Sequence, residues 1–119
     1  MSARMLVVHR RPPYGTSHAQ DAMEAVLASA ALGVEVAVAF VDDGVWQIVA
    51  GQHPGDTGLK DFVPAFRLLP ELDVGPIWVE RESLQRRGIG ARQLLLPAQV
   101  IGARALARRL DLYPVVIEL

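Results

Sequence analysis

The segment from Val34 to Val41 constrains the fold more than any other part of this sequence, because it is apolar at nearly every position. Only Glu35 interrupts it, and the intervening alanines leave no polar side. Such a run predicts a strand that is buried on both faces, as in a parallel sheet covered by helices. Met5-Leu6-Val7-Val8 is a second run of this kind, and it ends before Pro12-Pro13, which cannot continue a sheet ladder.

Helix signals lie between the predicted strands. Ser17 and Gln20 have the spacing of a capping box, and apolar residues follow at helical spacing until Gly33. Asp61 predicts the cap of a helix that runs to Leu69. The remaining predicted elements are a helical turn at 45–49, a loop at 51–58, a strand at 77–79, a short helix at 83–87, a strand at 94–96, a helix at 98–110 and a strand at 113–119. This alternation predicts an α/β fold with a parallel sheet covered on both faces.

Composition indicates how the domain meets its surroundings. Hydrophobic residues make up 51% of only 119 residues. One small core cannot hide so much apolar surface, so we expect an oligomer in which some faces contact other subunits. The longest apolar run is far shorter than a membrane span, and the first residues contain no signal-peptide cleavage site. We therefore expect a cytoplasmic protein without membrane contact.

Charge and cysteine content exclude several functions. The formal net charge is −1, which excludes a domain-wide field that would attract nucleic acid. The absence of cysteine excludes disulfides, iron–sulfur clusters and a cysteine nucleophile. Arginines are concentrated between residues 82 and 109, and three of them, Arg104, Arg108 and Arg109, fall in the last turns of a predicted helix. Cations favour that end of a helix dipole, and we prefer this explanation to an RNA or acidic-partner contact.

Neither glycine-rich segment nor the histidines predict a cofactor or metal site. Gly51 to Lys60 lacks the adjacent Gly-Lys and hydroxyl of a phosphate loop, and the turn at 88–90 lacks the third glycine of a dinucleotide fingerprint. His9, His18 and His53 match no zinc spacing, so we expect them to be solvated or to cap helices.

Asp42 and Asp43 follow a predicted parallel strand, where open α/β sheets place their sites. Two adjacent carboxylates could hold Mg²⁺ or accept a phosphoryl group, as in a receiver-like module. A turn is the favoured interpretation, because Asp before Gly commonly ends a strand and no lysine stands nearby.

The loops after the first two strands leave the same edge of a parallel sheet, and the position after the third strand shares that edge. We expect a rim there that faces a partner, while Trp46 and Trp78 are interpreted as core or interface anchors. The residues predicted to contribute to an interface are Tyr14, Asp43, Gly44, Val45, Trp46, Trp78 and Glu80.

Five segments carry a resemblance to a known family: residues 13–16 (PYGT), 40–47 (FVDDGVWQ), 51–52 (GQ), 66–69 (FRLL), and 78–79 leading into 83–88 (SLQRRG). In this order they resemble the DsrE/DsrF-like sulfur-relay family, and within it the TusC/DsrF branch. The resemblance implies a three-layer α/β/α fold with a five-stranded, mainly parallel sheet, as a single domain over residues 1–119. It also implies assembly with TusB-like and TusD-like subunits into a heterohexamer, which passes persulfide sulfur toward tRNA wobble-uridine 2-thiolation or, in related bacteria, serves sulfur oxidation.

Glu80 departs from the family pattern. The family's sulfur-carrying cysteine lies eight residues before the glycine that ends the next helix, and here that position, counted from Gly88, is Glu80. A carboxylate cannot form a persulfide, so the resemblance implies a non-catalytic, structural subunit. For Glu80 itself we expect an ion pair or full solvation at a surface site. Two alternatives stay open: a Mg²⁺-dependent or receiver-like module that uses Asp42 and Asp43, and a homo-oligomeric small-molecule binder.

Overall fold

The computed structural model describes residues 4–13, 18–49, 68–95 and 97–119, and its account of the fold is confined to them. These residues form a five-stranded sheet of order β4-β3-β2-β1-β5, in which every pairing is parallel. The strands are β1 (Arg4–His9), β2 (Glu35–Phe40), β3 (Ile77–Glu80), β4 (Gln99–Ile101) and β5 (Val115–Glu118).

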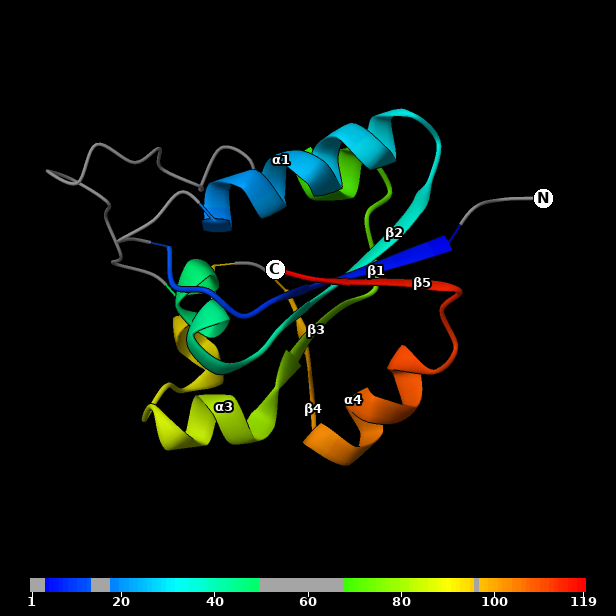
Figure 1. Ribbon diagram of the computed structural model, residues 1–119. Helices are drawn as coiled ribbons and strands as arrows, with labels where there is room; N and C mark the ends of the chain where they lie inside the picture. The colour runs from blue at the N-terminus through cyan, green and yellow to red at the C-terminus, as the bar shows by residue number, and fades with distance from the viewer. Residues whose placement is uncertain (1–3, 14–17, 50–67, 96) are drawn as a thin grey trace, which may run out of the picture.

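Helices cover both faces of this sheet. Figure 1 shows α1 on one side, beside the helical residues 68–71, and α4 on the other side. α3 follows the end of β3, and its buried Leu84 packs in the same core cluster as α1. The predicted three-layer α/β/α fold is therefore confirmed. Within the described ranges, no helix has the length and apolar character needed to cross a membrane. The helical segments are α1 (His18–Ala31), the 3₁₀ segment η1 (Asp42–Ile48), α3 (Arg81–Arg86), the 3₁₀ turn η3 (Ala91–Gln93) and α4 (Ala103–Leu110).

The core forms around β1 and β2, in which every residue after the first is buried. Successive side chains of a strand point to opposite faces, so each strand contributes to both layers. Val7, Val38 and Phe40 pack with α1, whereas Leu6 and Val8 pack with Leu106 of α4. The continuous apolar runs in the sequence are explained by this burial on both faces.

The predicted strand at 94–96 is wrong. Leu94 forms only an isolated antiparallel bridge with Val49, and β4 lies a few residues later, where Val100 pairs with Val79. The predicted helix at 98–110 consequently begins too early, because α4 starts at Ala103. A short apolar run does not distinguish a strand from a buried loop by its pattern alone, so tertiary pairing chose the strand.

The predicted helical turn at 45–49 is confirmed as part of η1, and the strand predicted over 113–119 is the shorter β5. The loop predicted at 51–58, the cap at Asp61 and the cap at Ser17 lie outside the described residues.

Candidate functional site

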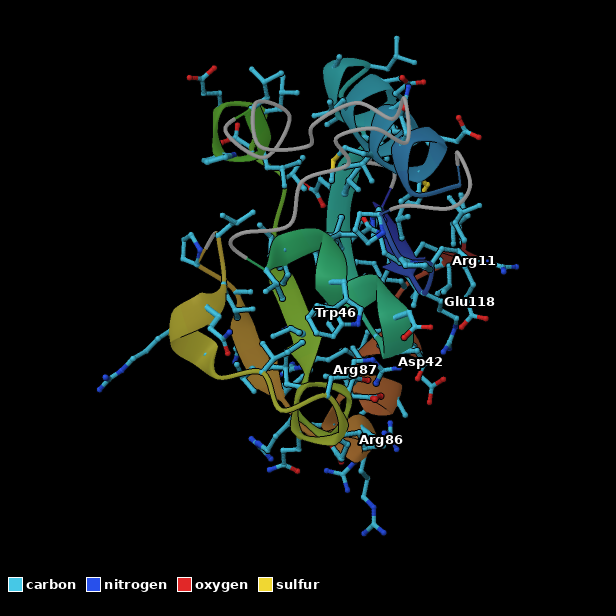
Figure 2. All side chains as sticks on the ribbon, turned by 90° about the vertical axis from the view of Figure 1, so that its left-hand side faces the viewer. Arg11, Asp42, Trp46, Arg86, Arg87 and Glu118 are labelled. Atoms are coloured by element: carbon cyan, nitrogen blue, oxygen red, sulfur yellow. The ribbon has the colours of Figure 1, made fainter. Side chains whose placement is uncertain are left out.

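The carboxyl ends of the parallel strands bring together charged side chains from distant parts of the chain. Figure 2 looks onto this edge and shows Arg11, Asp42, Trp46, Arg87 and Glu118 on its rim. All strands of a parallel sheet end on the same side, so the segments that follow β1, β2, β3 and β5 meet there. We call this region the carboxyl edge.

Arg10 joins η1 to the end of β5. Its guanidinium donates to the Asp42 carboxylate at 2.9 Å and to the Glu118 carboxylate at 3.0 Å. The hydrogen bond to Glu118 is the main cause that raises the pKa of Arg10. Asp42 has a left-handed backbone with a φ of 49°, a conformation in which Asp is enriched over most other side chains. These side chains are about half exposed, so their ion pairs orient the segments more than they stabilise them.

Asp43 contacts a different arginine. The Nε and Nη2 atoms of Arg87 donate to Asp43 Oδ1 at 3.2 and 3.0 Å, and Nη1 donates to the carbonyl oxygen of Ser83. The two adjacent aspartates are thus each paired with a separate cation, Arg10 just after β1 and Arg87 just after α3. In the described ranges, no three His, Asp or Glu side chains lie close enough to hold a metal ion.

Glu80 is held by a chain of hydrogen bonds through Ser83. Ser83 Oγ donates to Glu80 Oε1 at 2.5 Å and accepts a hydrogen bond from the backbone N–H of Asp42 at 2.8 Å. Arg86 also donates to Glu80, at 3.4 Å, so of the two states expected for this carboxylate the structure has the ion pair. The expectation of a surface site is wrong, because the Glu80 side chain is only 15% exposed and Ser83 is fully buried.

His9 contradicts the expectation of a solvated or capping histidine. It is the last residue of β1, is fully buried, and stacks on Phe40 with ring centroids 4.8 Å apart. Neither ring nitrogen has a hydrogen-bond partner among the residues that the structure describes. Burial lowers the pKa of His9 to about 4, so the ring is neutral at pH 7. The strand continues one residue further than its apolar run, and this extra residue takes the imidazole into the core.

Gly44 and Gln47 anchor η1 against the end of β1. A Cβ atom on Gly44 would collide with the carbonyl oxygen of His9, so the backbones approach more closely than any side chain would permit. Gln47 Nε2 donates to the carbonyl oxygen of Arg11 at 2.8 Å. Positions three apart share one face of a 3₁₀ helix, and this face lies against the end of β1.

The residues predicted for an interface occupy different environments. On η1, Asp43 is exposed and Trp46 is half-buried. Glu80 lies near η1, because Ser83 forms hydrogen bonds with both Glu80 and Asp42. Gly44, Val45 and Trp78 are buried within this chain. Their contact with another subunit, like that of Asp43, Trp46 and Glu80, stays a prediction, and Tyr14 lies outside the described residues.

Four residues of this edge escaped the sequence reasoning as site residues: Arg10, Ser83, Arg87 and Glu118. The positions of Arg10 and Glu118 could have indicated a site, because each lies at the end of a predicted parallel strand. Ser83 lies in the short helix α3 and Arg87 follows its last residue, and no local pattern indicates what they contact.

An open hollow of about 400 Å³ lies at the β1–β5 end of this edge. Its walls carry both signs of charge, and its lining is not the mostly apolar, enclosing surface typical of a small-molecule site. The hollow is lined by Arg10, Arg11, Pro12, Asp43, Glu118 and Leu119.

Comparison with known proteins identifies relatives over nearly the whole chain. The model of the DsrE/DsrF-like family matches residues 3–117. The intracellular sulfur oxidation protein DsrF of Allochromatium vinosum is 42% identical over 86 residues, which cover 72% of this chain and 63% of DsrF. The protein TusC homolog of Pseudomonas aeruginosa is 34% identical over 119 residues, the full length of both chains. Protein TusC of Escherichia fergusonii is 35% identical over 97% of this chain and 98% of its own length.

Solved structures share the fold at low sequence identity. The ychN protein from E. coli aligns over all of both chains with a TM-score of 0.82 and 18% identity. A protein of unknown function from Methanobacterium thermoautotrophicum aligns over all of both chains with a TM-score of 0.72 and 13% identity. At these identities the similarity shows the fold alone.

Proposed function

The chain belongs to the DsrE/DsrF-like family, and from that premise we propose that it is a non-catalytic subunit of a cytoplasmic sulfur-relay oligomer. In this proposal residues 1–119 act as one domain that assembles with TusB-like and TusD-like subunits. The assembly passes persulfide sulfur toward tRNA wobble-uridine 2-thiolation, or serves sulfur oxidation, the process in which the relative DsrF is named.

Glu80 is the observation that carries the non-catalytic role. The 119 residues contain no cysteine, and Glu80 stands where the family resemblance implies the sulfur carrier. Persulfide transfer requires a sulfur nucleophile, which a carboxylate cannot replace. Glu80 Oε1 instead accepts hydrogen bonds from Ser83 and Arg86. These contacts support a role for Glu80 in holding α3 at the end of β3.

The C-terminal part of the chain supports a role as a subunit. Leu112 is 60% exposed, and Val115, Val116 and Leu119 are 48%, 38% and 38% exposed. In the described sheet β5 pairs only with β1, so its other edge is open. An open strand edge with apolar side chains can pair with another chain. We propose that a neighbouring subunit of the relay covers this edge.

The two other functions suggested by the sequence have weaker support. The carboxylates of Asp42 and Asp43 face Arg10 and Arg87, which is an arrangement of ion pairs rather than of joint metal ligands. The hollow at the carboxyl edge is open and carries mixed charge, which suits a small-molecule binder poorly.

Co-expression with the TusB-like and TusD-like chains of the same host tests the proposal. We expect native mass spectrometry to show a complex of all three chains, with persulfide sulfur on the TusD-like cysteine and none on this chain. The complex with Glu80→Gln should transfer sulfur as the unchanged complex does. A homo-oligomer that ignores both other chains would refute the subunit role. Loss of transfer by an intact Glu80→Gln complex would show that the carboxylate takes part.

A matched pair of surface variants tests the covered edge. Leu112→Lys combined with Val116→Lys should prevent assembly, because the added charges would be buried against a neighbour. Leu68→Lys is the control, since Leu68 is 44% exposed but lies in the helical residues beside α1. Circular dichroism would show that each variant is folded. Equal loss of assembly in both variants would contradict the assignment of the β5 edge.

A further inference from the structure

Charge is divided unevenly between the part of the molecule around α1 and the part that contains α3 and α4. Residues 18–49 and 68–80 contain no lysine or arginine, and on the α1 side Glu71 and Asp73 add acidic charge. Residues 81–110 contain seven arginines and a single carboxylate, Glu82. Figure 1 shows that α3 and α4, which carry most of these arginines, both lie at the end of the molecule away from α1. A chain with a net charge of −1 therefore has a strongly basic side.

The arginines of this side are mostly uncompensated within the described residues. Arg87 is paired with Asp43, and Arg86 is 63% exposed and makes only a long contact with Glu80. Both oxygens of Glu82 accept the backbone N–H of Ala103 at 3.0 Å, and this hydrogen bond is the main cause that lowers the pKa of Glu82. Exposed arginines without an ion pair remain on both helices, and one of them, Arg109, lies over the Trp78 ring. We call the other three the basic face: Arg81, Arg104 and Arg108.

Two of these arginines stand where a helix disfavours a cation. Arg81 is the first residue of α3, and Arg104 is the second residue of α4. The amino end of a helix carries partial positive charge, so a cation there is repelled. A match to the helix dipole explains Arg108 and Arg109 in the last turn, but it does not explain Arg81 and Arg104.

Two residues of the basic face share one side of α4, and the third lies beside the residue that caps this helix. The Arg81 guanidinium lies beside Gly102, which caps α4, with Nη1 3.3 Å from the place a Cβ would occupy. Arg104 and Arg108 are one turn apart on α4, where like charges repel each other. The binding of an anionic partner would relieve the repulsion between these exposed arginines.

We propose that the basic face binds a protein partner through carboxylates on that partner's surface. Arginine forks pair with carboxylates in a bidentate geometry, which suits an acidic protein segment. An RNA strand fits less well, because within the described ranges no exposed aromatic ring accompanies the basic face. Trp78 is 4% exposed beneath Arg109, and Tyr113 packs between Trp78 and Arg4. The inference does not rest on the proposed relay function, because it needs neither the β5 edge nor a particular partner subunit.

Fluorescence anisotropy with the full chain tests this proposal. The probe is a labelled peptide of alternating Glu and Ala, and a labelled oligouridylate of equal charge serves as the second probe. We expect the peptide to bind at low salt and Arg104→Ala combined with Arg108→Ala to weaken binding about tenfold or more. The control variant, Arg4→Ala with Arg11→Ala, removes the same charge elsewhere and should change binding less than about twofold.

Each other outcome overturns the proposal. Tighter binding of the oligouridylate, lost in the α4 variant, would identify RNA as the occupant. Equal weakening by both variants would mean that net charge, and no particular face, attracts the peptide. Absence of peptide binding at low salt would refute the proposal that the basic face binds an acidic protein partner. Native mass spectrometry with the TusB-like and TusD-like chains separates these outcomes from a failure of the relay proposal, because the α4 variant should assemble normally.

Discussion

The carboxyl edge and the basic face use charge in opposite ways. At the carboxyl edge Arg10 and Arg87 each pair with a carboxylate from another segment, at distances near 3 Å. On the basic face Arg104 and Arg108 have no ion pair among the described residues. Charges of the first kind hold segments of the chain against one another, whereas charges of the second kind contribute little to folding. The contrast indicates which region maintains the fold and which is available to a partner.

Buried contacts strengthen this difference. Beneath the ion pairs of the carboxyl edge lie the fully buried Ser83, the stacked His9 and the close approach of Gly44 to β1. On α4 only Leu106 is buried. Changes at the carboxyl edge should therefore lower stability, and changes on the basic face should alter binding far more than stability.

Gly44→Ala should cause the largest loss of stability. The added Cβ would overlap the carbonyl oxygen of His9, so the end of β1 and η1 must move apart. We expect the free energy of unfolding to fall by about 3 kcal/mol, measured by urea denaturation. Gly90→Ala is the control, because its Cβ would meet only Gln93 Oε1 at 3.7 Å. Equal stability of the two variants would contradict the close packing of η1 on β1.

Acid should weaken the same region through His9. The pKa of His9 is about 4 in the folded chain and 6.5 when unfolded, so the unfolded chain binds the proton first as pH falls. Stability is then fully present above pH 6.5 and is lost between pH 6.5 and 4, by roughly 3 kcal/mol in total. Urea denaturation across this range would measure the loss, and His9→Phe should flatten it. An NMR titration that places the His9 pKa near 6.5 would contradict this account.

Ser83→Ala should have a smaller effect. It removes the acceptor for the Asp42 N–H and the donor to Glu80, and both groups are shielded from water. Loss of a partly buried hydrogen-bond pair costs about 1–2 kcal/mol. Glu80→Gln keeps an oxygen that can accept from Ser83, so thermal unfolding should show a smaller change. A Glu80→Gln variant less stable than Ser83→Ala would mean that the Arg86 ion pair matters more than the hydroxyl.

Changes to Arg104 should affect stability least. Arg104→Ala should stay within about 0.5 kcal/mol of the unchanged chain, since the side chain is exposed and makes no ion pair in the described structure. Arg104→Glu places an anion in the first turn of α4 and should raise stability by about 0.3–1 kcal/mol. Thermal unfolding at low salt would detect the gain. A clear loss in either variant would remove the contrast between the two regions.

Sequence reasoning predicted the fold better than the site. The apolar runs at 5–8 and 34–41 located β1 and β2, because burial on both faces leaves a pattern that is visible locally. The strand at 99–101 was missed, since its few residues become a strand only by pairing with β3. The site shows the same limit: Asp42 and Asp43 were recognised from their position, whereas Ser83, which connects Asp42 to Glu80, was not.

The sequence by itself determined the parallel α/β architecture, the family and, through the absence of cysteine, that these residues cannot carry persulfide sulfur. Each of these depends on local composition or order along the chain. Only the tertiary structure decided that His9 is buried and that Arg10 joins Asp42, 32 residues away, to Glu118, 108 residues away. Such contacts depend on the order of strands in the sheet, which places β5 beside β1. No local pattern records that order, because it is chosen by the packing of the whole chain.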